Sequence, residues 1–257
     1  MPELLHSKII GKGKPLLILH GLLGMGDNWI TMARRYAEGG FEVHLIDQRN
    51  HGKSFHSDEM NYEVMLDDLH NYIAYYQLDS FGLLGHSMGG KTAMYYATNY
   101  PQAVDKLIVV DIAPKYYPPH HRFIFKALNK IKPEEFTGRK AIEAVLQTDI
   151  ETPAIRQFLM KNLARQKNHS FYWKANLPVL EASLEELGKA LPVSTVYEKE
   201  TCFIKGKKSP YIQPEDRFLI RTHFPQAEII EIPKAGHWVH AEQPELFFTK
   251  TFSFLKK

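Results

Sequence analysis

Short apolar runs alternate with longer amphipathic segments along most of the chain. Each apolar run has the length of a buried strand and few polar interruptions, as is typical of parallel strands covered on both faces. We predict such strands at residues 15–20, 41–46, 80–84, 106–110, 201–205 and 228–232. Between the second and third runs, apolar residues recur at helical spacing: Met65, Leu69, Ile73 and Tyr76. The alternation predicts an α/β fold with a doubly wound, mostly parallel sheet, whose functional residues lie beyond the carboxyl ends of the strands.

One long segment interrupts this alternation. From Pro114 to Thr195 the pattern is helical, with almost no strand signal. We therefore divide the chain into a core of residues 1–113 and 196–257 and an inserted helical cap of residues 114–195. Residues 115–195 carry 13 basic and 8 acidic side chains, a net charge of +5, while the remainder carries −2. This excess fits either a solvated helical surface or a cap that attracts an anionic substrate.

Composition and charge narrow the class of protein. The 257 residues are 44% hydrophobic and 24% charged, which suits one soluble α/β domain with a sizeable core. We expect no membrane span and no signal peptide, because the chain lacks an apolar run of about 18 residues and a basic leader. The lone cysteine, Cys202, lies in an apolar run, which suits a buried strand position and a reducing, cytoplasmic location. A net charge of +3 without a basic helix argues against nucleic-acid binding.

The most informative motif is Gly85-His86-Ser87-Met88-Gly89, which follows an expected strand and precedes a helix-compatible run. Its glycines allow a sharp strand-to-helix turn without a Cβ clash. Such a turn lifts Ser87 Oγ above the sheet and directs the N–H of Met88 toward an oxyanion formed there. A free serine hydroxyl is a poor nucleophile, so a catalytic Ser87 requires a base and an orienting acid elsewhere in the chain.

Two other strand ends supply candidate partners for Ser87. The loop beginning His20-Gly21-Leu22 follows the first predicted strand. Glycine lets this loop approach the nucleophile, so the N–H of Leu22 can complete an oxyanion hole, while His20 braces the loop. His237 follows the last predicted strand on a loop entered through glycine, which suits a general base. His240 is the alternative base, although a histidine in the first turn of a following helix is usually structural.

Together these motifs resemble the α/β-hydrolase superfamily across nearly the whole chain outside the cap. Residues 47–52, 86–91, 111–114 and 236–240 more narrowly resemble the bacterial YbfF-type esterases and the related mitochondrial abhydrolase-domain lipases and esterases. The resemblance implies an α/β-hydrolase fold and hydrolysis of esters or thioesters, with simple acyl esters and acyl-CoA among the plausible substrates. It also implies that Asp47 and Arg49 brace a strand end and take no part in the chemistry.

The position of the acidic residue that should orient His237 departs from the commonest superfamily pattern. Most members carry an aspartate shortly after the strand that precedes the final one, but residues 205–211 contain no carboxylate here. Asp111, at the end of the preceding strand, can orient His237 and stabilise its imidazolium, and the YbfF-type sequences resemble this chain in having the acid there. Asp216 is the runner-up, but residues 214–216 look like the first turn of a helix, where carboxylates are favoured for structural reasons.

These residues predict a serine hydrolase that cleaves carboxylic ester or thioester bonds through an acyl-enzyme, with Ser87, His237 and Asp111 as its triad. We expect a small-molecule acyl substrate and neither a metal nor an organic cofactor. Aromatic residues of the cap, and one beside the base, are candidates for the substrate pocket: Tyr116, Tyr117, Phe171, Tyr172, Trp173 and Trp238. Two alternatives remain, a C–C bond hydrolase or haloperoxidase-like perhydrolase with the same triad, and a non-catalytic ligand receptor on the same fold.

Overall fold

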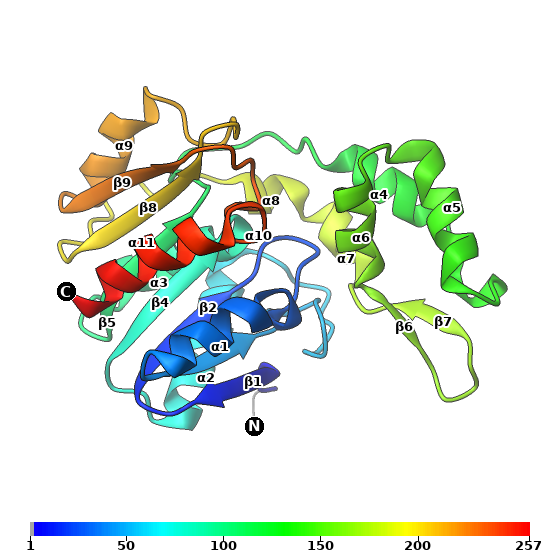
Figure 1. Cartoon of the computed structure of the whole chain (residues 1–257), viewed down its shortest axis with the longest axis horizontal. Helices are drawn as coiled ribbons and strands as arrows, with labels where there is room; N and C mark the ends of the chain where they lie inside the picture. The colour runs from blue at the N-terminus through cyan, green and yellow to red at the C-terminus, as the bar shows by residue number, and fades with distance from the viewer. Residues whose placement is uncertain (1–2) are drawn as a thin grey trace.

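A seven-stranded sheet in the order β1-β3-β2-β4-β5-β8-β9 forms the centre of the molecule (Figure 1). The computed structural model describes residues 3–257. The strands are β1 (Ser7–Gly11), β2 (Lys14–Leu19), β3 (Phe41–Ile46), β4 (Phe81–His86), β5 (Val104–Val110), β8 (Thr201–Gly206) and β9 (Ala227–Ile232). All neighbours are parallel except β1 with β3. The six strands predicted from apolar runs are confirmed. The edge strand β1 was not predicted, because its residues are mostly half-exposed or exposed and form no apolar run.

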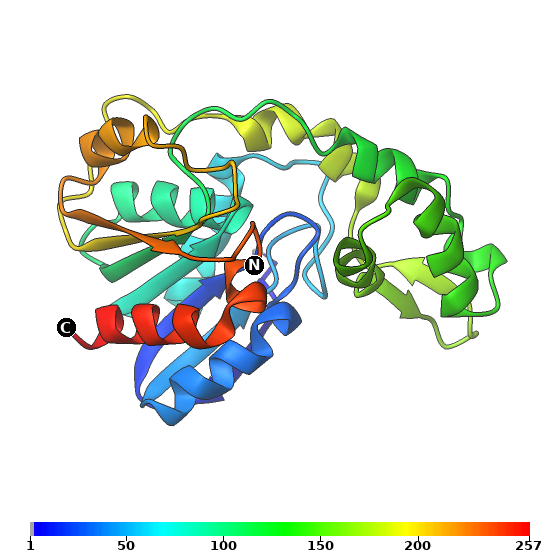
Figure 2. The same ribbon diagram turned by 45° about the horizontal axis from the view of Figure 1, so that its top comes forward.

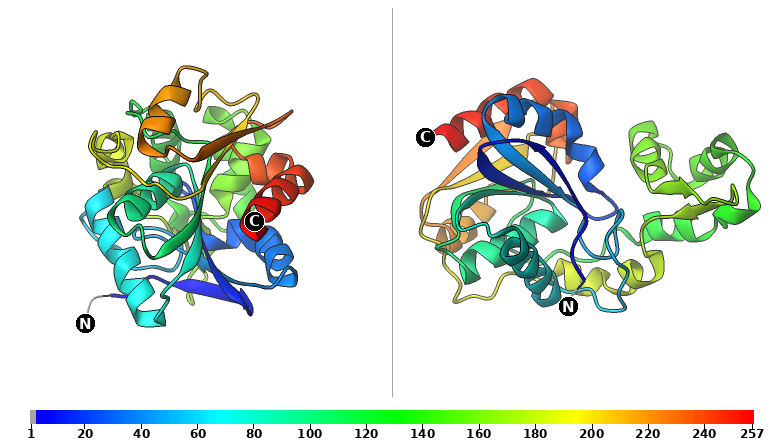
Figure 3. Two further views of the ribbon diagram at one scale, coloured as in Figure 1. Left: turned by 90° about the vertical axis from the view of Figure 1, so that its left-hand side faces the viewer. Right: turned by 90° about the horizontal axis from the view of Figure 1, so that it is seen from below.

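Helices cover both faces of the sheet, as Figure 3 shows. Successive strand residues point to opposite faces, so Leu16 and Ile18 of β2 join one core while Leu17 and Leu19 join the other. The first core is closed by α1 (Ile30–Glu38), which follows the short helix η1 (Gly26–Trp29), and by α10 (Val239–Glu242) and α11 (Pro244–Lys256). The second is closed by α2 (Tyr62–Tyr76), α3 (Met88–Asn99) and α9 (Asp216–His223). The doubly wound α/β fold is confirmed. Among residues 3–257, no helix is both long and apolar enough to cross a bilayer.

The chain between β5 and β8 carries a lobe set apart from the sheet (Figures 1 and 2). Its elements are α4 (Arg122–Asn129), η2 (Pro133–Glu135), α5 (Arg139–Asp149), α6 (Pro153–Met160), β6 (Leu163–Arg165) and β7 (Phe171–Trp173). The chain returns through α7 (Leu177–Ala182) and α8 (Leu184–Gly188), and α8 lies against the core, where the carbonyl of Leu187 accepts the hydroxyl of Tyr62 (Figure 1). The antiparallel hairpin of β6 and β7 was not predicted, because three-residue strands are too short to give a recognisable alternation. We keep the name cap for residues 114–195, the division proposed from the sequence.

The two ends of the cap meet beside α3. The N–H of Leu191 donates to the carbonyl of Pro114 (3.0 Å). Lys91 of α3 is buried, and its Nζ donates to the carbonyls of Lys115 (2.6 Å) and Lys189 (2.5 Å). The Lys91 side chain thus binds both the segment that enters the cap and the segment that leaves it.

Candidate active site

Ser87 lies on the turn between β4 and α3. Its backbone adopts φ 54° and ψ −118°, a region that residues other than glycine rarely occupy and that persists where the surroundings enforce it. The N–H of Ser87 donates to the carbonyl of Val110 (2.9 Å), so pairing with β5 extends into the turn. The flanking glycines are required by space, since a Cβ on Gly85 would lie 2.1 Å from the oxygen of Gly89. The strand-turn-helix context predicted for Ser87 is therefore present.

Asp111 and His237 are joined by a hydrogen bond across 126 positions of sequence. His237 Nδ1 donates to Asp111 Oδ2 at 2.7 Å. Asp111 is fully buried at the end of β5, and its carboxylate also accepts the N–H of Gly206 (3.0 Å) and the hydroxyl of Ser209. Burial raises the pKa of the Asp111 carboxyl, and the bonds from Ser209 and Gly206 oppose that rise. Burial lowers the pKa of His237, so its ring is neutral near pH 7 and its Nε2 can accept a proton.

The two alternative residues have other partners. His240 is buried at the start of α10 and stacks on Trp29, with ring centroids 3.8 Å apart. Asp216 begins α9, as its sequence context predicts, and its Oδ2 accepts bonds from Lys115 Nζ (2.6 Å) and the N–H of Gln213 (2.7 Å). The contact that a triad acid must make to its histidine is therefore made by Asp111.

A narrow cavity of about 40 Å³ opens beside Ser87. Leu22 and Met88, the residues predicted to form the oxyanion hole, line it together with Ser87. Met88 is the first residue of α3, where N–H groups lack intrahelical partners and the helix dipole favours negative charge. The loop that carries Leu22 passes very close to the nucleophile, since a Cβ on Gly21 would lie 3.2 Å from the Cβ of Ser87. Cap residues 117–121 and 184–188 supply much of the opposite wall.

Two buried histidines hold the loop that carries Leu22. His20 Nδ1 donates to the carbonyl of Gly21 (2.8 Å), and its Nε2 accepts the N–H of Gln48 (2.9 Å). His51 Nε2 accepts the N–H of Leu23 (3.1 Å). Burial lowers the pKa of His20 to about 4 and that of His51 to about 3, so both rings are neutral and can accept these bonds. The prediction that His20 braces this loop is confirmed.

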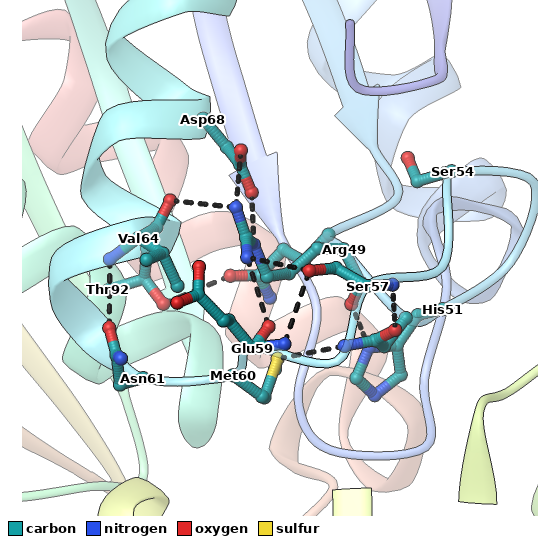
Figure 4. Close-up of polar contacts among 12 residues, drawn as sticks. Arg49, His51, Ser54, Ser57, Glu59, Met60, Asn61, Val64, Asp68 and Thr92 are labelled. Atoms are coloured by element: carbon teal, nitrogen blue, oxygen red, sulfur yellow. Dashed lines mark hydrogen bonds and ion pairs between the residues drawn. The ribbon is translucent and has the colours of Figure 1, made fainter. Parts of the chain in front are cut away.

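Arg49 and Asp47 brace the end of β3. Figure 4 shows the Arg49 guanidinium between α2 and the loop before it, donating to both oxygens of Asp68 (2.5 and 2.8 Å) and to the carbonyl of Glu59 (2.9 Å). The Asp47 carboxylate accepts two backbone N–H groups at 2.7 and 2.8 Å. The structural role implied for these two residues is confirmed.

The predicted pocket aromatics occupy different parts of the molecule. Tyr117 is the one among them that lines the cavity beside Ser87 within residues 3–257. Tyr116 is 47% exposed, and its hydroxyl donates to Glu185 at the surface. Phe171, Tyr172 and Trp173 form β7 of the cap hairpin. Trp238 packs against Phe158 of α6, with ring centroids 5.5 Å apart.

Several residues of the site were missed from the sequence. Tyr211 lines the cavity and stacks on His237, with ring centroids 4.0 Å apart and planes inclined by 15°. Ser209 bonds to Asp111, and Lys91 lines the cavity. Position is the only sequence signal for them: Ser209 and Tyr211 follow a strand end, and Lys91 lies one helical turn after Ser87.

The sheet, the strained turn at its centre and the polar residues at neighbouring strand ends are those of an α/β hydrolase. A family described as the alpha/beta hydrolase fold matches residues 14–244, and the chain belongs to this family. The sn-1-specific diacylglycerol lipase ABHD11 of Danio rerio is 37% identical over 99% of this chain and 83% of the relative. Esterase YbfF of Escherichia coli is 33% identical over 90% of this chain and 89% of the relative. The solved structure of a marine microorganism esterase is 42% identical, with a TM-score of 0.96 over 98% of this chain and all of that one. The resemblance stated from the motifs is confirmed.

Proposed function

We propose that this protein hydrolyses carboxylic esters or thioesters through an acyl-enzyme on Ser87. The observation that carries the proposal is the 2.7 Å bond from His237 Nδ1 to Asp111, which leaves Nε2 of the neutral ring free to act as a base. Ser87, Leu22 and Met88 share one cavity, so a carbonyl bound there meets a nucleophile and two oxyanion donors together. The names of the relatives, an esterase and a lipase, agree with this class of reaction.

In the proposed reaction His237 Nε2 takes the proton of Ser87 as Oγ attacks the acyl carbonyl. The N–H groups of Leu22 and Met88 bind the oxyanion, and His237 then protonates the departing alcohol or thiol. A water molecule, deprotonated by His237, attacks the acyl-enzyme and releases the carboxylic acid and free Ser87. Asp111 remains ionised and stabilises the imidazolium in both halves of the cycle.

The cap is proposed to select the substrate. The cavity of about 40 Å³ is far smaller than the roughly 300 Å³ typical of ligand pockets, so an acyl chain requires the cap side to move. The net positive charge of residues 115–195 favours an anionic leaving group such as coenzyme A. Added salt should therefore slow acyl-CoA turnover more than turnover of a neutral ester, since screening weakens exposed charge attraction. Equal salt sensitivity of the two substrates would contradict the preference for an anionic substrate but not the proposed ester hydrolysis.

A substrate panel tests the reaction and the nucleophile together. Wild-type protein, Ser87→Ala and the control Ser253→Ala, at an exposed position of α11, are assayed with p-nitrophenyl esters and acyl-CoAs of graded length. We expect turnover by wild type and control, and a loss of about 10³-fold or more in Ser87→Ala, because the oxyanion hole and binding alone leave little catalysis. Full activity of Ser87→Ala would assign the chemistry to another residue. A wild type inactive on every ester and thioester would overturn the proposed function.

A further inference from the structure

We propose that Tyr211 is a positioning residue through which the cap holds the proposed base, His237, in its reactive orientation. The part of the cap concerned is its leading segment, residues 114–121, which connects β5 to α4. The inference rests on the proposed role of His237.

The first observation is the face contact between the two rings. Tyr211 lies in the loop between β8 and α9, and its ring is nearly parallel to that of His237 at a centroid distance of 4.0 Å. Apart from a tilted contact with the ring of His86, whose centroid lies 4.7 Å away, the bond to Asp111 fixes the Nδ1 edge of the imidazole and leaves a pivot about that bond. A stacked ring restricts this pivot, and the pivot determines where Nε2 points.

The second observation is that the leading segment of the cap forms hydrogen bonds with Tyr211. Its hydroxyl lies 2.6 Å from His120 Nε2 and 3.1 Å from His121 Nε2, and its carbonyl accepts the hydroxyl of Tyr117 (2.6 Å). His120 Nδ1 donates to the carbonyl of Pro118 (2.8 Å), so in the neutral ring Nε2 accepts the Tyr211 O–H. His121 Nε2 then donates to the Tyr211 oxygen, and burial, by lowering the pKa of His121 to about 3, keeps that ring neutral. Three hydrogen bonds therefore link the leading segment of the cap to Tyr211, two at its hydroxyl and one at its backbone carbonyl.

The third observation is that the substrate must contact the same segment. Tyr117, His120 and His121 line the cavity together with Ser87. Because the cavity is only about 40 Å³, a bound acyl group must press against these residues, and any shift of them acts on the bonds that hold Tyr211. The position of the leading segment is thereby coupled to the orientation of His237, as in other enzymes whose lids complete the catalytic arrangement.

Two substitutions of Tyr211 distinguish the contribution of its ring from that of its hydroxyl. Tyr211→Leu removes the stacked ring, whereas Tyr211→Phe keeps it and removes the bonds to His120 and His121. The matched control is Tyr116→Phe, because the neighbouring Tyr116 hydroxyl bonds to Glu185 at the surface, outside the cavity. Each variant is tested for p-nitrophenyl acetate kinetics over a range of pH, and for the rate at which a fluorophosphonate labels Ser87.

We expect Tyr211→Leu to lower kcat by about 10- to 100-fold with KM little changed, because a misdirected base affects the chemical steps. Labelling of Ser87 should slow by a similar factor. The acid limb of kcat/KM should move to higher pH, because exposing His237 to water raises its lowered pKa toward the ordinary value of about 6.5. Tyr211→Phe should recover most of the rate and keep a deficit of about 3- to 10-fold, about 1 kcal/mol for the lost hydroxyl contacts. The control should match wild type.

Other results would overturn the inference. If Tyr211→Leu labels Ser87 at the wild-type rate, or raises KM without changing kcat or the pH profile, the ring contacts substrate and does not position the base. If Tyr211→Phe loses as much as Tyr211→Leu, the stack is not the operative contact. Should Tyr211→Leu fail to fold, Tyr211→Phe decides alone: a wild-type rate, or a loss well beyond about tenfold, would overturn the inference. A wild type that is never labelled at Ser87 contradicts the proposed function, which is a separate failure.

Discussion

The two walls of the cavity are held in different ways. On the core side, Asp111 is fully buried with three partners, and Ser87 is fixed by the pairing of β4 with β5. On the cap side, polar contacts with the core are made by individual side chains on several elements, such as Lys91, whose Nζ bonds to two cap carbonyls, and Tyr62, whose hydroxyl donates to the carbonyl of Leu187. Rigid strand ends suit groups that must keep a geometry to within fractions of an ångström, and point contacts suit a wall that must move for substrate.

The cap also contacts the loop that carries Leu22, through Asn162 and through Lys174, whose Nζ lies 3.5 Å from Met25 Sδ. Asn162, which follows α6, donates from Nδ2 to the carbonyl of Leu23 at 2.7 Å. The core holds the other side of the same loop through His51. The loop that carries Leu22 is therefore supported by the core on one side and by the cap on the other.

The largest expected effect is a loss of kcat, caused by a substitution on the core side of the cavity. Asp111→Asn should lower kcat by about 10³- to 10⁴-fold, because an amide can hold His237 in the tautomer that cannot accept the proton of Ser87. Asp216→Asn, at the carboxylate that begins α9 and bonds to Lys115, should cost less than about tenfold because structural carboxylates contribute little to transition-state binding. Steady-state kinetics of both variants decide the assignment. Near-full activity of Asp111→Asn would remove Asp111 from the triad.

The next effect concerns the stability of the core. Arg49→Ala leaves Asp68 buried without its partner, so the free energy of unfolding should fall by about 3–5 kcal/mol. The matched control is Glu245→Ala, which breaks the equally bidentate but exposed pair with Arg35 and should cost about 1 kcal/mol or less. Urea denaturation measures both. Equal losses for the two variants would show that burial of the Arg49 pair adds nothing.

The smallest effect is expected at the cap's contact with the loop. Asn162→Ala should lower kcat by about 3- to 10-fold, equivalent to about 1 kcal/mol of lost orientation. Asn168→Ala is the control, because Asn168 bonds only within the tip of the hairpin, to Ser170 (2.8 and 3.1 Å). If both variants retain wild-type kcat, the cap does not support the loop beside Ser87.

The same contrast explains what the sequence could predict. Strands β2 to β5 are covered on both faces and are therefore visible as apolar runs, whereas β1 is half-exposed and the hairpin strands have three residues each. The positions of Ser87 and His237 at strand ends could be predicted because glycine-bounded turns are local features of sequence, and their catalytic roles remain predictions. Asp111 needed the resemblance as well, since its contact with His237 spans 126 positions. The contact of Tyr211 with His237 could not be predicted, because a ring stack depends on how two distant loops lie against each other. Phe171 was predicted to line the pocket, but it is buried in the packing of the cap itself.

Covalent labelling followed by mass spectrometry shows whether Ser87 is the nucleophile. A fluorophosphonate probe is incubated with the full-length protein, and the adduct is counted by intact mass and located by peptide mapping. We expect one adduct per chain, on the peptide that contains Ser87, and none in Ser87→Ala. An adduct on another residue, or labelling that persists in Ser87→Ala, would contradict that assignment.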